Sequence, residues 1–266
     1  MAAIKTALIT GGTSGIGLAI ARKLASQNCN IILVGSRPSK DYSEAVQIVS
    51  KVAQTQAGSP WVKSYGVDVT KEADVTALMK VLQADNITLD IVVHSAGVFF
   101  DTPITDESSE AFDRMITINV NGMWNIIRSA LPLVKKGSEN QPGGKIVALS
   151  SICSFFSFAT YSGYCASKAA VTALTKSLAL ELGPMGININ AVEPGRVETP
   201  MHDQLINDPA QAEILKSIAS SNPSRRAFSS PDDIANVVAF LTSDAAQAMH
   251  GAAIVIDEGM SLGLGA

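Results

Sequence analysis

Two side chains with acid–base chemistry, Tyr164 and Lys168, stand four residues apart in the run Tyr-Cys-Ala-Ser-Lys. On a helix this spacing places both groups on one face. A free tyrosine has a pKa of about 10, so a phenol exchanges protons poorly near neutral pH. A lysine ammonium beside it favours the phenolate, and lowering the pKa to near 7 requires roughly 4 kcal/mol. The pair is therefore a candidate donor and acceptor of a proton at a substrate oxygen.

The Tyr-x-x-x-Lys motif alone is weak evidence for catalysis, because it is also common as an ordinary surface pair. Further polar residues support a catalytic role for this pair. Ser151 follows a predicted strand, at the edge where doubly wound sheets place their ligands. Asn119 falls inside a predicted apolar helix, where an amide is costly unless its hydrogen bonds are used. Tyr161 rivals Tyr164 for the acid–base role, but the residue four positions after it is Cys165, which carries no positive charge. The expected catalytic residues are Asn119, Ser151, Tyr164 and Lys168.

A glycine-rich turn, Thr10–Gly17, follows the first predicted strand and opens the first predicted helix. Its glycines let the backbone turn tightly and approach a pyrophosphate, while the helix N-terminus offers free N–H groups and the positive end of its dipole. The spacing Gly-x-x-x-Gly-x-Gly differs from the GxGxxG pattern, and a turn that merely needs positive φ is the alternative. The expected cofactor contacts in it are Gly11, Thr13, Ser14, Gly15, Ile16 and Gly17.

The second predicted strand is followed by Gly-Ser-Arg-Pro-Ser-Lys, with no carboxylate. An acidic residue here marks sites for NAD, whereas a nearby arginine suits the 2′-phosphate of NADP. Arg37 offers a planar fork for that phosphate, helped by Ser36, so NADP(H) is favoured and NAD(H) stays an open alternative. A solvated surface arginine is the other interpretation. Asp68 and Val69, after the third predicted strand, are placed to contact adenine, unless Asp68 only serves the N-terminus of the next helix.

Short β-branched runs alternate with longer helical patterns along the chain. Strands that read as continuous apolar runs are buried on both faces, which indicates a parallel sheet flanked by helices. The predicted strands are 7–10, 31–34, 62–67, 91–93, 145–149, 187–192 and 253–256. The predicted helices are 16–27, 42–56, 71–84, 107–135, 162–182 and 231–242. We therefore expect an α/β fold: a single doubly wound (Rossmann-type) domain over residues 1–266, with a parallel seven-stranded sheet and helices on both faces.

The composition excludes several classes of protein. Apolar residues make up 47% and charged residues 17% of the 266 residues, which excludes intrinsic disorder. No apolar stretch approaches the ~20 residues that span a bilayer, and a net charge of −4 argues against a nucleic-acid partner. The three cysteines form no CxxC motif, which speaks against a disulfide framework or a metal site. Because no leader pattern opens the chain, we expect a cytoplasmic protein.

Two predicted helices are apolar around most of their circumference, namely 107–135 and the segment after Lys168. Such a helix has to be covered on both sides. In a protein with one sheet a second subunit can supply the other cover. We therefore expect a homo-oligomer, either a tetramer or a dimer.

These motifs together resemble the short-chain dehydrogenase/reductase family, in the subgroup with a TGxxxGIG turn. The resemblance covers residues 5 to about 262. Besides the residues above, it rests on Ser95-Ala96-Gly97, Pro194-Gly195, Thr199 and Ile256-Asp257-Glu258-Gly259.

The resemblance implies a hydride-transferring enzyme with a nicotinamide cofactor. In such an enzyme Tyr164 would be the acid–base residue, and Lys168 would lower its pKa and hold the nicotinamide ribose. Ser151 would bond the substrate oxygen, and Asn119 would hold a water that connects Lys168 to solvent. The further cofactor contacts that it implies are Ser95, Ala96, Gly97, Tyr164, Lys168, Pro194, Gly195, Val197 and Thr199, with the carboxamide held by the last two.

Two positions depart from the family pattern. Ser95 stands where the family usually has asparagine, so we expect a bond that stabilises the central sheet to be absent or rerouted, with more effect on stability than on chemistry. Ser14 stands where many NADP-using relatives carry Lys or Arg in the glycine turn. The NADP(H) preference therefore rests mainly on Arg37.

Five of the eight phenylalanines lie in two segments, 99–100 and 155–158, that flank the expected carbonyl site. An aromatic-walled pocket suits a bulky or apolar ketone or secondary alcohol, although some of these rings could instead pack the loops or an oligomer interface. The five phenylalanines are Phe99, Phe100, Phe155, Phe156 and Phe158.

Residues 201–222 are expected to form a mobile helical lid over the pocket.

Relatives with this pattern often reduce thioesters on acyl carrier protein, with basic residues near the end of the active-site helix. Here that end reads Gly183-Pro184-Met185-Gly186, which weakens this interpretation. Glu193 could face a cationic substrate, but its place at a strand end favours a structural role. We predict NADP(H)-linked reduction of an apolar ketone or 3-oxoacyl-type substrate. The alternatives are an NAD-dependent secondary-alcohol dehydrogenase and a non-catalytic nucleotide-binding sensor on the same fold.

Overall fold

One parallel sheet of seven strands forms the centre of the protein, which confirms the predicted fold class. The computed structural model describes residues 4–36, 41–138 and 141–262. The strands are β1 (Thr6–Thr10), β2 (Asn30–Gly35), β3 (Val62–Gly66), β4 (Ile91–His94), β5 (Lys145–Leu149), β6 (Asn188–Pro194) and β7 (Ala253–Ile256). Their order is β3-β2-β1-β4-β5-β6-β7, with every neighbouring pair parallel. The order reverses between β1 and β4, where doubly wound folds bind ligands.

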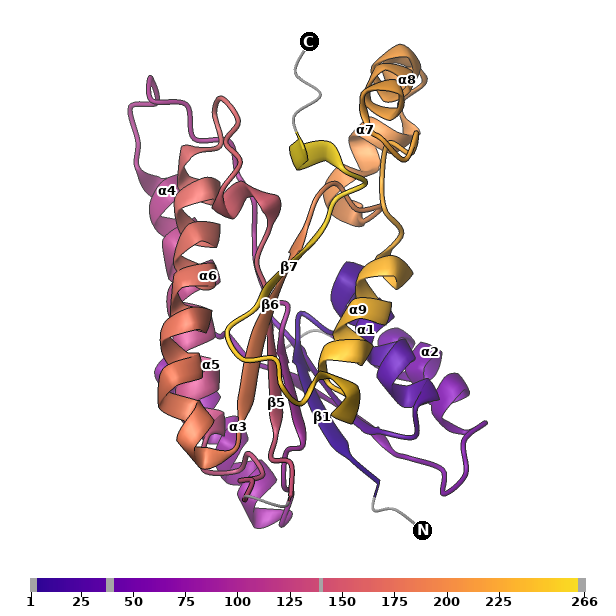
Figure 1. Cartoon of the computed structure of the whole chain (residues 1–266), viewed down its shortest axis with the longest axis vertical. Coiled ribbons are helices and arrows are strands. Elements are labelled where there is room, and N and C mark those ends of the chain that lie inside the picture. Colours follow the sequence, from indigo (N-terminus) through magenta and orange to yellow (C-terminus); the bar gives the residue numbers. More distant parts are fainter. Residues whose placement is uncertain (1–3, 37–40, 139–140, 263–266) are drawn as a thin grey trace.

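Helices cover both faces of this sheet (Figure 1). One face carries α1 (Gly15–Ser26), α2 (Ser43–Ala53) and α9 (Pro231–Leu241), and the other carries α3 (Glu72–Ala84), α5 (Gly122–Ala130) and α6 (Ser162–Leu182). Two short helices, α7 (Asp203–Asn207) and α8 (Ala212–Ser221), lie beyond the carboxyl ends of the strands, in the segment predicted to be a lid. Within the described ranges, no helix combines the length and apolar character needed to cross a bilayer.

The helix predicted over 107–135 is shorter and less regular than expected. It runs as α4 (Glu110–Met115), then as a π-helical turn over Ile116–Asn121, and then as α5. The chain passes close to the β3–α3 loop here, since a Cβ on Gly122 would lie 2.7 Å from Val69 Cγ2. π turns are rare and often occur at functional sites. This one contains Asn119, an expected catalytic residue.

The sheet divides the core in two, because successive residues of a strand point to opposite faces. In β1, Ala7 and Ile9 pack with side chains of α1, α2 and α9, whereas Leu8 packs with side chains of α3, α5 and α6. All residues of β1 are buried, as expected for a strand covered on both faces. The buried strands fix the positions of their carboxyl ends, from which the polar residues of the site emerge.

Candidate active site

The glycine turn between β1 and α1 has a backbone geometry that favours glycine. Gly11 and Gly15 have φ angles of 64° and 51°, in the left-handed region. A Cβ on Gly17 would lie 2.2 Å from the Gly11 carbonyl oxygen, so any side chain there would displace the turn. Within the described chain, no side-chain hydrogen bond caps α1 at Ser14. The free N–H groups at this helix end therefore fit the pyrophosphate of a dinucleotide.

The segment after β6 faces the glycine turn. Thr199 lies close to Gly15, because a Cβ on that glycine would be 3.5 Å from Thr199 Cγ2. Gly195 packs against the chain just after β7, where a Cβ on it would lie 2.8 Å from Asp257 Cβ. The structure thus brings together the predicted cofactor residues of 11–17 and of 194–199, which are far apart in sequence.

Thr10 connects the Ser95-Ala96 segment to β1. Its Oγ1 accepts hydrogen bonds from the backbone N–H groups of Ser95 and Ala96 at 3.2 and 3.1 Å, and it lies 3.1 Å from His94 Nδ1. Because the hydroxyl accepts from both amides, its own proton is available to His94 Nδ1. These bonds use the backbone of Ser95 and not its side chain, so the effect of serine at this position stays a prediction. The ends of β1 and β4 are joined through Thr10, two backbone amides and an imidazole.

His94 makes the fold sensitive to acid. It is buried, and its Nε2 has no hydrogen-bond partner among the described residues. Burial, and to a smaller extent Lys168, lowers the pKa of His94 from 6.5 to about 3. Between these values the unfolded chain binds a proton that the folded chain does not, so the free energy of unfolding falls as the pH falls below 6.5.

Replacing His94 by asparagine, which can still accept the Thr10 proton, should remove this acid sensitivity. Between pH 7.5 and 5.5, we expect the wild type to lose about 1.4 kcal/mol more of its free energy of unfolding than His94→Asn loses. Urea titrations of both proteins at the two pH values measure the difference. Equal losses would mean that the imidazole is not kept neutral in the folded state.

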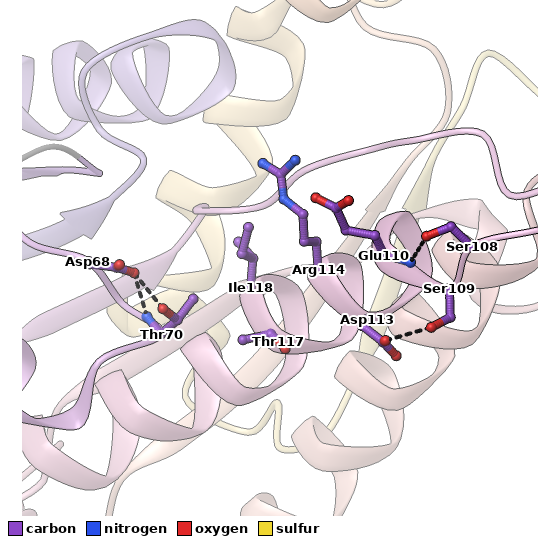
Figure 2. A pocket seen from close by; sticks show the side chains of 9 residues that line it. All are labelled: Asp68, Thr70, Ser108, Ser109, Glu110, Asp113, Arg114, Thr117 and Ile118. Carbon is purple, nitrogen blue, oxygen red and sulfur yellow. Dashed lines mark hydrogen bonds between the residues drawn. The ribbon is translucent and has the colours of Figure 1, made fainter.

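Asp68 lies beside an open groove of about 560 Å³ between the β3–α3 loop and α4. Figure 2 shows Asp68 and Thr70 on one side of the groove and the helix bearing Asp113, Thr117 and Ile118 on the other. The Asp68 carboxylate accepts hydrogen bonds from Thr70 N and Oγ1 at 3.0 and 2.7 Å. It therefore stabilises the turn before α3, and its contact with adenine stays a prediction.

The other residues predicted at the adenosine end lie at separate places. Ser36 follows β2 and is exposed, whereas Val69 is buried against the helix at Gly122. Arg37 lies outside the residues that the structure describes.

Tyr164, Ser151 and Lys168 lie together at the carboxyl edge of the sheet. Tyr164 and Ser151 line a small cavity of about 90 Å³. Lys168 is buried, with its Nζ 5.5 Å from the centroid of the Tyr164 ring, and donates a hydrogen bond to the Leu149 carbonyl at 2.7 Å. The Ser151 hydroxyl donates to the Pro194 carbonyl at 3.3 Å. The spacing of four residues on α6 thus places phenol and ammonium near each other, as predicted.

The predicted lowering of the Tyr164 pKa is wrong for the protein chain by itself. Burial raises the pKa of the Tyr164 phenol, Cys153 adds to this, and the Ser151 hydroxyl only partly opposes it. Burial also lowers the pKa of Lys168 to about 8. Residue spacing predicts that the two groups lie near each other, but it does not predict the cost of moving both of them out of water.

Asn119 uses its amide within the protein. Its Oδ1 accepts from Val98 N at 2.8 Å, and its Nδ2 donates to the Val98 carbonyl and to Ser167 Oγ, both at 3.0 Å. These bonds hold the π turn to the β4 loop and α6, which explains why a buried amide is tolerated there. A Cβ on Gly97 would lie 3.2 Å from Asn119 Oδ1 and 3.6 Å from Lys168 Nζ, so both groups surround this glycine. The water-holding role of Asn119 stays a prediction.

Aromatic rings form one wall of the cavity beside Tyr164, although fewer than predicted. Phe99 lies edge-on to the Tyr164 ring with 5.1 Å between centroids, and Phe158 lies 5.4 Å from the Tyr161 ring. Phe99, Phe158 and Tyr161 all line the cavity. The predicted rings that do not line it are Phe100, which contacts Arg114, Phe155, which is exposed, and Phe156, which packs on Phe158.

Arg196, His202 and Met260 also line the cavity, and the sequence patterns do not single them out. Arg196 directly follows Pro194-Gly195, and a place beside a cofactor motif is a signal that could have found it. His202 donates from Nδ1 to the Val197 carbonyl at 2.9 Å, at the start of the segment predicted to be a lid. Met260 comes from the C-terminal turn, which no local pattern connects to the cavity.

Glu193 is buried and does not line the cavity. Its Oε1 accepts hydrogen bonds from Ser154 Oγ at 2.6 Å and from Thr172 Oγ1 at 2.7 Å. Because Ser154 lies just after Ser151 and Thr172 lies in α6, the carboxylate joins these two segments. This is the structural role that its strand-end position favours. In the described ranges, no group of three or more His, Cys, Asp or Glu residues could hold a metal ion.

Comparison with known proteins places the chain in a family. A family model described as enoyl-(acyl carrier protein) reductase matches residues 11–261. A D-beta-hydroxybutyrate dehydrogenase of Cupriavidus necator is 34% identical, over 96% of this chain and 97% of that enzyme. The solved structure of a short-chain type dehydrogenase/reductase from Mycobacterium ulcerans has a TM-score of 0.86 at 30% identity, covering 97% of this chain and 90% of that one. A Pseudomonas aeruginosa RhlG/NADP complex has a TM-score of 0.87 at 26% identity, covering 97% of each chain.

The chain belongs to the short-chain dehydrogenase/reductase family, as its motifs indicate. It is an oxidoreductase that transfers a hydride between a nicotinamide cofactor and a carbon atom bearing a carbonyl or hydroxyl oxygen.

Proposed function

We propose that this enzyme uses NADPH to reduce an apolar ketone or a 3-oxoacyl-type compound, and that it also catalyses the reverse oxidation. The observation that carries the proposal is that Tyr164 and Ser151 line one aromatic-walled cavity. A proton donor beside apolar rings suits a substrate with a carbonyl on an apolar frame. A panel of ketones and secondary alcohols, assayed with both nicotinamide cofactors, tests it. Absence of NADPH-linked turnover with every ketone would contradict it.

Each residue of the site would have a distinct task. Tyr164 donates a proton to the carbonyl oxygen and accepts it back in the reverse direction. Ser151 donates a hydrogen bond to the same oxygen and stabilises the charge that develops there. Lys168 holds the ribose hydroxyls, and Asn119 holds a water between Lys168 and solvent. When bound, the cofactor supplies the hydride and, in its oxidised form, a positively charged ring.

The raised pKa of Tyr164 supports the reductive direction. A phenol that stays protonated at neutral pH is ready to give its proton to a ketone oxygen. Oxidation of an alcohol needs the phenolate instead, and the positive charges of Lys168 and of the oxidised cofactor would have to oppose the effect of burial. We therefore expect reduction to proceed at a lower pH than oxidation.

For the cofactor we propose NADP(H), because the run Ser-Arg-Pro-Ser-Lys directly after β2 contains no carboxylate and includes Arg37, whose side chain type suits a 2′-phosphate. The RhlG complex with NADP supports the same assignment. Arg37→Asp is expected to lower the ratio of kcat/KM for NADPH to that for NADH by about 100-fold, since a carboxylate repels the phosphate and accepts the ribose hydroxyls. Initial rates with both cofactors measure the ratio.

An arginine on α1 that carries no predicted cofactor role provides the matched control for that substitution. Arg22 is exposed on α1, so Arg22→Asp changes the net charge equally and should leave the cofactor ratio within twofold. A wild-type enzyme that prefers NADH would instead favour the alternative, an NAD-dependent secondary-alcohol dehydrogenase.

We also propose that the enzyme is a homo-oligomer, either a tetramer or a dimer. Phe112 and Trp124, on the α4–α5 helix, are 38% and 44% exposed, and Leu180 on α6 is 81% exposed. Large apolar side chains gathered on neighbouring helices are typical of interfaces. Light scattering at micromolar concentration checks the proposal, and a mass near the 27.8 kDa of one chain would contradict it.

The segment with α7 and α8 would act as a lid over the cavity. Met201 and His202, at its start, already line the cavity. Thr199, just before it, lies beside Gly15 of the glycine turn. A movement of this segment would therefore change the access of both substrate and cofactor.

A further inference from the structure

A positive charge without an anionic partner lines the substrate cavity. The Arg196 guanidinium donates from Nη1 to Met260 Sδ at 3.0 Å. A thioether is a weak acceptor, whereas a guanidinium carries five N–H donors in a planar fork that matches a carboxylate. Among the residues that the structure describes, none forms an ion pair with Arg196. Most of the hydrogen-bonding capacity of this side chain is therefore unused by the protein.

No other charge in the cavity compensates for Arg196. None of the lining residues in the described ranges is acidic. Glu193, which sequence reasoning considers for a cationic substrate, is instead bonded to Ser154 and Thr172. Burial lowers the pKa of the second basic group, His202, and with it the imidazole's tendency to carry charge. The cavity as a whole is therefore positive, which favours an anion.

The partly buried position of Arg196 makes this charge costly. Burial lowers the pKa of Arg196, although an arginine stays protonated in proteins. Removing a charged group from water without a partner is unfavourable, and a bound anion would offset that cost.

The backbone around Arg196 is held in place before any ligand binds. The Arg196 carbonyl accepts from Ser229 N at 2.9 Å. The turn that carries Met260 is fixed by the Asp257 carboxylate, which accepts from Ser261 N at 2.7 Å. The two segments that carry Arg196 and Met260 therefore do not have to reorganise when a ligand binds.

We infer that the substrate is a compact oxo acid, or the corresponding hydroxy acid, whose carboxylate pairs with Arg196 while its carbonyl lies at Tyr164 and Ser151. This inference rests on the proposed function and adds the substrate class. The cavity of about 90 Å³ is far smaller than the roughly 300–1,000 Å³ of pockets for drug-sized ligands, which favours a molecule of few carbon atoms. Phe99 and Phe158 then contact the carbon chain between the two polar groups.

Matched pairs of acids and neutral esters test the inference. The probes are acetoacetate and 3-oxohexanoate, each beside its methyl ester, with NADPH oxidation as the readout. We expect the wild type to prefer the acids, and Arg196→Gln to lower the ratio of kcat/KM for acid over ester by about 100-fold. Arg196→Lys, which keeps the charge, should lower the ratio by less than tenfold. Arg225→Gln, at an exposed arginine, should leave the ratio unchanged.

The possible outcomes separate this inference from the proposed function. If the wild type reduces esters and simple ketones but not the acids, or if Arg196→Gln lowers both rates equally, the proposed function stands and the inference fails. If the wild type reduces none of the compounds, the proposed function fails. Calorimetry with NADP⁺ present then decides the inference alone. The wild type should bind butyrate at least tenfold more tightly than butyramide, and Arg196→Gln should show no such preference. Equal binding of the two compounds to the wild type would overturn the inference.

Discussion

Tyr164→Phe is expected to lower kcat/KM for ketone reduction by about 10³-fold while the enzyme stays folded and binds NADPH. The change removes one oxygen, which is the proton donor that lies with Ser151 in the cavity. General acid catalysis contributes about 10² to 10⁴ in rate, and a buried site offers no well-placed water to take over. Steady-state rates measure the loss. Quenching of NADPH fluorescence should give a dissociation constant within threefold of the wild type.

Tyr161→Phe is the matched control, because it removes the same atom from a ring that lines the same cavity. Tyr161 has no lysine four residues later, and burial and Asp101 raise its pKa while Arg196 opposes them. We expect this variant to retain activity within tenfold of the wild type. If Tyr161→Phe caused the larger loss, the assignment of the proton donor would have to move to Tyr161.

The fold could be predicted because its strands are buried on both faces. A continuous apolar run such as Ile31–Val34 has no polar side to expose, so it has to lie in a covered parallel sheet. The π turn over Ile116–Asn121 could not be predicted in this way. It lies beside the close approach of Gly122 to Val69, two residues that are distant in sequence. Local patterns contain no information on such contacts.

The candidate site likewise contains residues that local patterns can place and residues that depend on long-range contacts. Ser151 follows a strand and Tyr164 and Lys168 share a helix face, so local patterns suffice to place them. Arg196 and Met260 meet only because the loop after β6 and the C-terminal turn fold against each other. For the chain without a bound cofactor, the direction of the Tyr164 pKa shift could not be predicted for the same reason. The charge four residues away is visible in the sequence, whereas the burial of the phenol results from the packing of several distant segments.

Lys168→Met is expected to abolish most activity and yet to stabilise the protein at neutral pH. The loss of activity should reach about 10³-fold in kcat/KM, because the variant has no ammonium to hold the ribose or to act on the phenol. The gain in stability follows from burial, which lowers the pKa of Lys168 from 10.5 to about 8. At pH 7 the folded chain keeps a buried ammonium at a cost of about 3 kcal/mol relative to the unfolded chain. Methionine fills a similar volume without that charge.

The stabilisation should depend on pH in a direction that identifies its cause. The wild type gains stability as the pH rises from about 8 to 10.5, because in this range the unfolded lysine still holds a proton that the folded lysine has lost. Removal of the lysine also removes its hydrogen bond to the Leu149 carbonyl, which offsets part of the gain. At pH 7 we therefore expect the free energy of unfolding of Lys168→Met to exceed that of the wild type by about 1–2 kcal/mol. Most of this difference should vanish by pH 10.

Lys176→Met, at an exposed position of the same helix, provides the control for removing a lysine from α6. We expect it to change the free energy of unfolding by less than about 0.5 kcal/mol at either pH and to leave activity within twofold. Guanidinium titrations of the three proteins at pH 7 and pH 10 give the comparison. A Lys168→Met protein that is less stable than the wild type at pH 7 would show that the ammonium is stabilised in its buried site. Lys168 would then hold the fold together as well as serving the reaction.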